Sequence, residues 1–193
     1  MPDARPRRLT PRVAAMLGSA GVLVVALSGC AGTPAPTPAP PASASAAPIF
    51  ASDEEALAAA EAAYERFLAA SAQATSEGGP GVAGLAAVAS GNAYVSQVES
   101  VEDYLNDRVH STGRRTFATY ALQSVVLGAD EVVVVSFYVC DDLRGLDVLR
   151  EDGSSVVASD RVVDVPYLVV VEGERESMKV SEKALWEREN FCL

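Results

Sequence analysis

The stretch that decides the fold is EVVVVSFYVC, at residues 131–140. Positions 132–135 are all valine, and an unbroken apolar run is typical of a strand that is buried on both faces in the middle of a sheet. Three more runs rich in valine, threonine, tyrosine and phenylalanine surround it, at 116–127, 161–171 and 176–186. The sequence therefore predicts a sheet of about four long strands, in which 131–140 is central and covered on both sides.

Short connections join these strands in pairs, so the sheet should be antiparallel. Gly128-Ala129-Asp130 separates the first pair and residues 172–175 separate the last pair, and both lengths suit hairpins. Pro166 cannot donate a hydrogen bond to a neighbouring strand, which predicts that its strand lies at an edge or contains a bulge. The segment 141–160 between the two pairs is polar, and residues 151–154 predict a tight turn.

Helical patterns come before the strands. Ser52-Asp53-Glu54-Glu55 is a capping box, and apolar residues recur at helical spacing over 57–68. A short second helix is predicted at 84–90 and a third at 94–109, with Gly113 as the residue that ends the third. Helices followed by strands predict an α+β domain, with N-terminal helices packed on one face of a curved antiparallel sheet.

Motifs in this region also carry a family resemblance. They are Tyr138-Val139-Cys140-Asp141, Val148 to Gly153, Arg161 with the valines after it, and Trp186 with Asn190-Phe191-Cys192. They resemble a family of small lipoproteins from actinobacteria, over about residues 51–193. The order of three helices and four strands resembles the cystatin-like cone of the nuclear transport factor 2 superfamily. Cone folds include isomerases, dehydratases and plain binding modules, so the resemblance implies a fold and no particular activity.

The first 30 residues have the parts of an export signal. Four arginines precede an apolar run at 13–27, and these fifteen residues are few for a transmembrane helix of about 20. The run closes in Leu27-Ser28-Gly29-Cys30, which resembles a bacterial lipobox. The resemblance implies cleavage before Cys30 and diacylation of Cys30, which would anchor the protein on the outer face of the cytoplasmic membrane. The alternatives are an uncleaved anchor or a cysteine that is present by chance.

The sequence thus divides into three parts. Residues 1–29 are the predicted lipoprotein signal peptide, and 30–50 are a tether rich in proline, alanine, serine and threonine, a composition typical of extended linkers. Residues 51–193 form one domain, long enough for a single core.

Removing the signal peptide makes the protein more acidic. Residues 1–29 contain four arginines and one aspartate, so their loss changes the net charge from −11 to −14. Such a charge repels phosphate backbones, and nucleic acid is therefore not an expected partner. Anionic lipid headgroups are repelled as well, so membrane contact should come through the lipid anchor alone.

With Cys30 acylated, Cys140 and Cys192 remain as an even pair in an oxidising compartment. Alternate strands of a meander run the same way, so the second and fourth strands should end on one side of the sheet, about 10 Å apart. Residues 187–191 are long enough for Cys192 to reach Cys140 across that gap. We expect a disulfide. A metal or redox pair, the alternative, would need closer cysteine spacing and further ligands.

Few residues are candidates for catalysis or metal binding. His110 is the only histidine, and its predicted place in the last turn of the third helix favours a structural role. The acidic residues of 141–152 could bind a hard cation, but their spacing is not that of a calcium loop. No metal site and no cofactor are predicted.

Glu182 is the best candidate for an acid–base carboxylate. By strict alternation it shares its strand face with four largely apolar residues, Met178, Val180, Ala184 and Trp186. If that face points inward, Glu182 could act with Tyr120 or Tyr138 as hydrogen-bond donor. If the strand twists or bulges, Glu182 is exposed to solvent, and this is the alternative that we favour. Further aromatic residues could line an interior cavity, namely Tyr64, Tyr104 and Trp186.

Three hypotheses for function follow. The first is a non-enzymatic envelope module that binds a protein or a small apolar ligand. The second is a cone-fold enzyme of the isomerase or dehydratase kind, which acts on a small apolar substrate by acid–base chemistry. The third is a structural module that forms a homodimer through the open face of its sheet.

Overall fold

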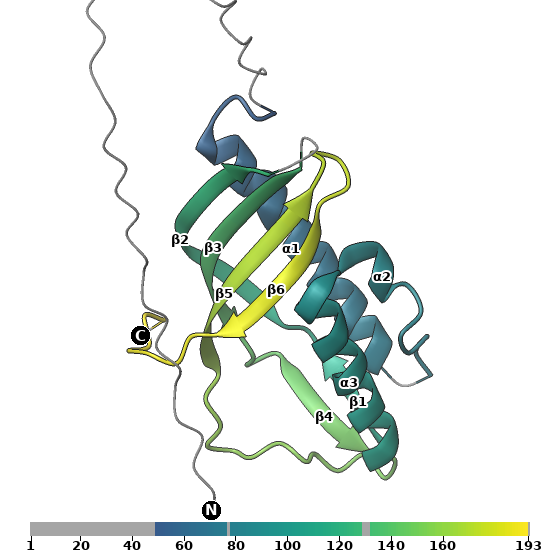
Figure 1. The fold of residues 1–193 in the computed structure, drawn as a ribbon. Helices are drawn as coiled ribbons and strands as arrows, with labels where there is room; N and C mark the ends of the chain where they lie inside the picture. The colour runs from purple at the N-terminus through teal and green to yellow at the C-terminus, as the bar shows by residue number, and fades with distance from the viewer. Residues whose placement is uncertain (1–48, 77, 129–131, 193) are drawn as a thin grey trace, which may run out of the picture. The chain divides into compact units, whose positions relative to one another are not determined.

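The computed structural model describes residues 49–76, 78–128 and 132–192, so the signal peptide, Cys30 and nearly all of the tether lie outside the described residues. Three helices and six strands make up the described part (Figure 1). In chain order they are α1 (Asp53–Thr75), α2 (Leu85–Val88), α3 (Gly91–Asp107), β1 (Val109–Gly113), β2 (Thr116–Leu127), β3 (Val133–Asp142), β4 (Leu146–Arg150), β5 (Asp164–Gly173) and β6 (Lys179–Leu185). None of the described helices is both long enough and apolar enough to span a membrane.

The four predicted long strands form one antiparallel sheet in the order β2-β3-β5-β6. The interior position of β3 is confirmed, and so is the α+β class with helices on one face. The prediction that β3 is covered on both sides is wrong. Val133 and Val135 are buried beneath the helices, whereas Val134 on the other face is only half-buried. The reason is that described helices pack against one face of the sheet alone.

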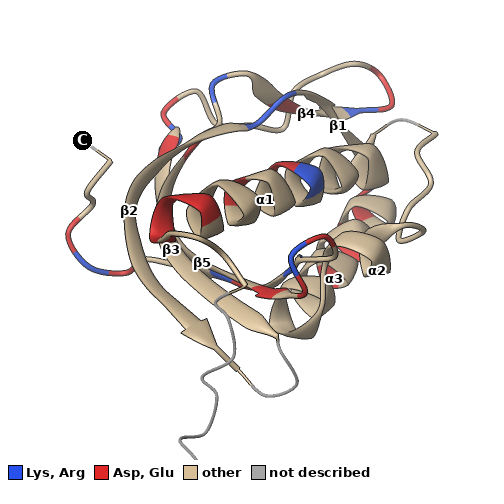
Figure 2. Cartoon of the chain, turned by 90° about the horizontal axis from the view of Figure 1, so that it is seen from above, with Lys and Arg blue, Asp and Glu red and all other residues tan. Residues whose placement is uncertain are grey.

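Helix α1 lies along the concave side of the sheet, and Figure 2 shows β2, β3 and β5 curving around it. Ala56 and Ala60 are fully buried, and these small side chains let the helix approach the strands closely. The N-terminus of α1 is capped as predicted. Ser52 Oγ accepts a hydrogen bond from the Glu55 amide at 3.3 Å, and the Glu55 carboxylate accepts one from the Ala51 amide at 2.7 Å.

The region after α3 differs from the prediction. The helix ends at Asp107 because Arg108 has a left-handed conformation (φ 54°), and Val109–Gly113 forms β1, which pairs with β4. His110 therefore lies in a strand opposite Leu149 and not in a helix. Gly113 does not cap the helix. It lies where the chain passes Gly145, and a Cβ atom there would be 1.9 Å from the Gly145 carbonyl oxygen.

The predicted polar segment contains both a strand and the predicted turn. β4 begins at Leu146 and gains its backbone partners from β1. The tight turn follows it: the Gly153 amide donates to the Arg150 carbonyl at 2.9 Å, and Gly153 has a φ of +80°.

The sequence predicted an edge position or a bulge for the strand of Pro166. The structure places it in an interior strand, and the register shift in the pairing of β5 with β6 lies at Val170/Val171, away from Pro166. Its carbonyl accepts a hydrogen bond from the Trp186 amide at 3.0 Å, on the β6 side. The nitrogen and carbonyl of one residue point to the same side of a strand, so the missing N–H also faces that side. β6 ends at Leu185, so the missing donor lies where the pairing of β5 with β6 stops.

Candidate functional site

A bulge in β6 decides which of its side chains face the helices. Val180 pairs with Val171 and Glu182 pairs with Val170, so Ser181 is an extra residue between them. Because side chains alternate along a strand, one extra residue reverses the facing of every residue after it. Val180 is buried on the helix side, and beyond the bulge Lys183, opposite the buried Val169, occupies that side.

Glu182 consequently does not face the interior. Its carboxylate accepts a hydrogen bond at 2.8 Å from the side-chain amide of Asn92, near the start of α3. The hypothesis of an inward Glu182 that acts with Tyr120 or Tyr138 is therefore wrong, and the alternative of a bulged strand is what the structure shows. The structure brings Glu182 together with neither tyrosine.

We expect Glu182→Gln to leave the free energy of unfolding almost unchanged, because a glutamine can still accept the hydrogen bond from Asn92. Urea unfolding followed by tryptophan fluorescence measures this. Lys183→Gln, one residue further along the same strand, is the control and should be clearly destabilising. A Glu182→Gln protein as unstable as the Lys183→Gln protein would show that Glu182 has a role that its hydrogen bond does not explain.

The inward residues meet in a buried polar cluster, which we define as Tyr64, Arg115, Asp141 and Lys183. Asp141 is the last inward residue of β3 and is fully buried. The Tyr64 hydroxyl of α1 donates to Oδ1 of Asp141 at 2.8 Å, and the Lys183 ammonium donates to Oδ2 at 2.8 Å. Arg115, just before β2, lies 3.6 Å from the same Oδ2. Four segments of the chain are thus joined at one carboxylate.

Aromatic rings surround the charges of the buried polar cluster. Lys183 Nζ lies 3.9 Å from the ring centroid of Tyr167, and the Phe117 ring packs edge-on against Tyr64 at 4.9 Å. Burial, helped by the nearby Arg115, lowers the pKa of Lys183 to about 8, because these effects outweigh the attraction of Asp141. Burial also raises the pKa of the Tyr64 phenol well above its ordinary value, and the charge of Asp141 adds to this.

The lowered pKa of Lys183 predicts that the protein becomes more stable as the pH rises from about 8 to about 9.5. In that range the unfolded lysine holds its proton and the folded one releases it, so the unfolded state binds more protons and the free energy of unfolding rises, by about 1.5 kcal/mol. The buried tyrosines titrate only above this range. Urea unfolding at several pH values tests this, and Lys183→Met should remove the rise. A flat or falling profile in the unaltered protein would contradict it.

The sequence predicted that Tyr64, Tyr104 and Trp186 could line one interior cavity. In the structure, Tyr64 and Tyr104 do not share a cavity with Trp186. Tyr64 is fully buried in the core, where its hydroxyl is bound to Asp141. Tyr104 is half-buried on α3 and lines a small polar cavity together with Arg115. Trp186 lies beyond the end of β6, in a separate group of rings.

That group of rings is the aromatic cluster, which we define as Tyr120, Tyr138, Trp186 and Phe191. Tyr120 stacks on Phe191 with ring centroids 4.6 Å apart, and Tyr138 packs edge-on against Trp186 at 5.1 Å. The register shift in β2 after Thr119 falls at Tyr120, and Tyr138 alternates with the buried residues of β3. The rings therefore lie on the face of the sheet opposite to the helices.

A cavity of about 360 Å³ opens at the aromatic cluster. All four rings line it, and Arg188 and Glu189 complete its rim. Tyr120 is 62% exposed, and the Arg188 guanidinium lies over the Trp186 ring, 5.3 Å from its centroid. Of the predicted cavity-lining and donor residues, the structure thus brings together Tyr120, Tyr138 and Trp186, on the outer face of the sheet.

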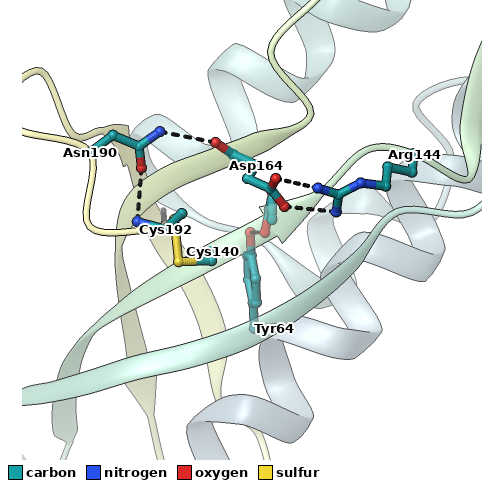
Figure 3. Close-up of a disulfide and its surroundings, with 7 residues drawn as sticks. Tyr64, Cys140, Arg144, Asp164, Asn190 and Cys192 are labelled. Atoms are coloured by element: carbon teal, nitrogen blue, oxygen red, sulfur yellow. Dashed lines mark hydrogen bonds and ion pairs between the residues drawn. A yellow bond between two sulfur atoms is a disulfide. The ribbon is translucent and has the colours of Figure 1, made fainter.

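The predicted disulfide between Cys140 and Cys192 is confirmed, with the two Cα atoms 5.5 Å apart. It ties the C-terminal segment to β3, as Figure 3 shows. Asn190 strengthens the attachment, since its side chain accepts from the Cys192 amide at 2.9 Å and donates to the Asp164 carbonyl at 3.2 Å. Because Phe191 precedes Cys192, the disulfide also holds one ring of the aromatic cluster in place.

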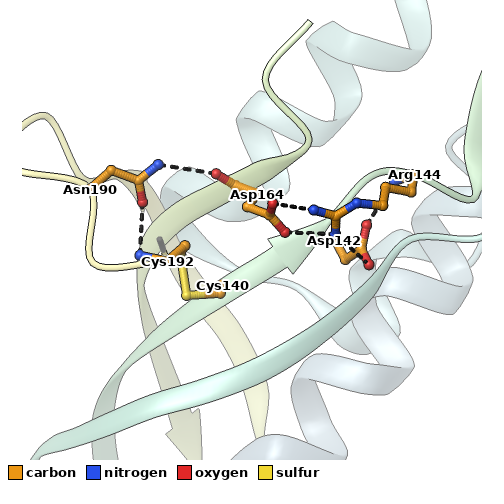
Figure 4. Close-up of polar contacts among 6 residues, drawn as sticks. All are labelled: Cys140, Asp142, Arg144, Asp164, Asn190 and Cys192. Carbon is orange, nitrogen blue, oxygen red and sulfur yellow. Dashed lines mark hydrogen bonds and ion pairs between the residues drawn. A yellow bond between two sulfur atoms is a disulfide. The ribbon is translucent and has the colours of Figure 1, made fainter.

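The acidic residues of 141–152 do not come together as cation ligands among the described residues. Arg144 contacts both Asp142 and Asp164, as Figure 4 shows, and its backbone amide hydrogen bond lowers the pKa of the Asp142 carboxyl. Asp147 accepts a hydrogen bond from Ser155 at 2.6 Å. Within residues 49–76, 78–128 and 132–192, no three His, Cys, Asp or Glu side chains are arranged to hold a metal ion.

Sequence reasoning missed Asp141 and Lys183. A signal for Asp141 is present in the sequence, because Val135, Phe137 and Val139 alternate toward it; the predicted strand ends at Cys140, two residues before the end of β3. No local signal marks Lys183, because its facing depends on the bulge at Ser181.

No protein-family model matches the chain, and no curated protein matches it. Among solved structures, the chain is similar to the intermembrane space region of the chloroplast protein ARC6, with a TM-score of 0.42 and 14% sequence identity. That similarity covers 65% of this chain and 92% of the other.

Proposed function

We propose that this protein is a lipid-anchored, extracytoplasmic interaction module that binds another envelope protein through its aromatic cluster. The observation that carries the proposal is the set of four rings on the outer face of the sheet, around a cavity of about 360 Å³. Tyrosine, tryptophan and arginine are the residues most enriched at binding hot spots. Tyr120, Trp186 and Arg188 supply all three types within this one site.

A rigid support favours binding at this site. The disulfide and the hydrogen bonds of Asn190 hold the C-terminal segment against the sheet, so the rings lose little conformational freedom when a partner binds. The charge of −14 without residues 1–29 favours a partner surface that is neutral or basic.

The proposal also includes the membrane location of the protein and its relationship to a protein family. The lipobox-like sequence at Cys30 supports anchoring on the outer face of the cytoplasmic membrane, and a disulfide agrees with an oxidising compartment. The curved sheet around α1 agrees with a cystatin-like cone. The proposed relationship to the small actinobacterial lipoproteins rests on the sequence motifs between Tyr138 and Cys192.

The acid–base enzyme is the second candidate, and it would now depend on Asp141 and Lys183 instead of Glu182. These two groups bind each other and Tyr64 within the core. Neither of them lines the cavity at the aromatic cluster. The third candidate, a homodimer through the open face, would use the aromatic cluster itself and is an outcome of the following test.

The test places a photo-crosslinking amino acid at position 120 in the living bacterium, with position 162 as the control. Val162 is 67% exposed but lies away from the aromatic cluster, in the segment before β5. We expect one discrete adduct with another membrane-associated protein from position 120, which Trp186→Ala abolishes and which position 162 does not give. An adduct with a second copy of the chain would support the homodimer instead, and equal labelling from both positions would refute a specific site.

We expect the mature protein to begin at an acylated Cys30 and to sediment with membranes. Cys30→Ala should abolish both the acylation and the cleavage before position 30, because both depend on this cysteine, so the variant should retain residues 1–29. Intact mass spectrometry and membrane fractionation measure these outcomes. Thr33→Ala, three residues away, is the control and should keep the lipid. An unaltered mature protein that lacks acyl chains or retains residues 1–29, or a Cys30→Ala protein that is still acylated, would contradict the prediction.

A further inference from the structure

A pair of adjoining cavities lies between α1, α3 and the chain around β1 and β2, on the other side of the sheet from the aromatic cluster. The larger has a volume of about 550 Å³, within the range of about 300 to 1,000 Å³ that is typical of ligand sites. The smaller has a volume of about 60 Å³. Both are lined by Leu68, Ala72 and Arg115, so the two cavities meet at these residues.

The smaller cavity is lined mainly by polar side chains. Its hydroxyl groups come from Ser71, Thr75, Ser100, Tyr104 and Ser111. Thr75 and Ser111 share a hydrogen bond at 2.6 Å, but the buried Ser71 hydroxyl has no partner among the described residues. A buried hydroxyl without a partner is unfavourable, so a guest that accepts its hydrogen bond would be stabilised here. The volume suits a group of a few heavy atoms.

Arg115 gives the wall shared by both cavities a positive charge. Its guanidinium has five donors, and its one ion-pair contact within the described chain is the 3.6 Å approach to Asp141. Asp141 is already paired with Lys183 at 2.8 Å, so Arg115 adds a cation that this carboxylate does not fully neutralise. Arg114 also lines the larger cavity, and Glu65 is the one carboxylate among its lining residues. The balance of charges that line the two cavities therefore favours binding of an anion.

The larger cavity supplies an apolar wall next to this charge. Leu68, Ala69, Ala72 and Phe117 line it. A ligand that filled both cavities would therefore have a small anionic head and an apolar body.

We propose that the two cavities form a binding site for a small amphipathic monocarboxylate. Its carboxylate lies in the smaller cavity and accepts hydrogen bonds from Arg115 and Ser71, and its apolar body lies against Leu68, Ala72 and Phe117. Guanidinium and carboxylate groups form strong, charge-assisted hydrogen bonds. Because the rest of the protein is strongly acidic, an anion would be repelled elsewhere on its surface. The site shares no residue with the aromatic cluster and does not depend on the function proposed above.

The test titrates the full chain carrying Cys30→Ala with 4-phenylbutyrate, followed by amide NMR shifts. The neutral 4-phenylbutyramide, which has almost the same shape, is the matched ligand. We expect saturable shifts around Ser71 and Arg115 with the acid and binding weaker by roughly tenfold or more with the amide, because the charge-assisted bonds are lost. Equal affinity for both ligands, or no saturable shifts with either, would overturn the proposal.

Variants then test which residues hold the carboxylate. Arg115→Gln should weaken binding of the acid by roughly tenfold or more and leave the amide unaffected. Since Arg115 also approaches Asp141, Ser71→Ala is the second variant: it removes an unpartnered hydroxyl, should not harm folding, and should weaken the acid several-fold. Arg150→Gln, at an exposed residue of β4, is the control for general electrostatics and should change nothing. If Arg150→Gln weakens binding as much as Arg115→Gln, or if Ser71→Ala binds the acid as tightly as the unaltered chain, the proposed site is wrong.

Discussion

Asp141→Ala will lower the free energy of unfolding by about 3–5 kcal/mol, the cost that is typical when one partner of a buried ion pair is removed. The substitution leaves the Lys183 ammonium and the Tyr64 hydroxyl buried without the acceptor that both now share. Urea unfolding at pH 7 measures the loss. Asp142→Ala is the matched control, because the next residue points to the other face and pairs only with the exposed Arg144. It should have little effect.

A double replacement separates the ion pair from simple packing. Asp141→Leu combined with Lys183→Met should recover most of the stability that Asp141→Ala loses, because apolar side chains of similar size often replace a buried ion pair at no net cost. If Asp141→Ala proves no more harmful than Asp142→Ala, the carboxylate is not buried as described.

Removing the disulfide will have the other large effect. Cys140→Ser combined with Cys192→Ser should lower the free energy of unfolding by about 4 kcal/mol, as the chain-entropy model gives for two cysteines 52 residues apart. Phe191 should also separate from Tyr120, which would change the environment of the single tryptophan, Trp186. Urea unfolding and Trp186 fluorescence measure both effects.

Cys30→Ala is the control for the disulfide variant, because it removes a cysteine outside the predicted domain of residues 51–193. It should leave the unfolding curve unchanged. A disulfide variant that loses less than about 1 kcal/mol, or cysteines that alkylate in the native protein without a reductant, would show that the C-terminal segment is not held in this way.

The sheet and the disulfide could be predicted because both depend on patterns of short range. Alternation and turn residues identified the strands, and a meander necessarily places the ends of β3 and β6 on one side, with β5 between them. Cys140 and Cys192 follow from that arrangement. β1 and β4 could not be found in the same way. Each is five residues long, and each is stabilised by paired residues that lie 33 or more positions away along the chain.

The buried polar cluster could not be predicted because the facing of Lys183 has a tertiary cause. The bulge at Ser181 lies where the start of α3 meets β6: the Ser90 amide donates to the Val180 carbonyl at 2.9 Å. A Cβ atom on Gly91 would lie 2.9 Å from the Ser181 carbonyl oxygen. A strict period of two places Glu182 inward, and the bulge at this contact between distant segments places Lys183 there instead.

The affinity of the purified partner, once it is identified from the position-120 adduct, tests the central claim most directly. The claim is that the aromatic cluster is the binding surface, so Trp186→Ala should weaken binding by roughly tenfold or more, as truncation of a hot-spot tryptophan does. Val162→Ala, at an exposed apolar residue outside the aromatic cluster, should bind as the unaltered protein does. Equal affinity of the Trp186→Ala and unaltered proteins, measured by calorimetry, would contradict the account.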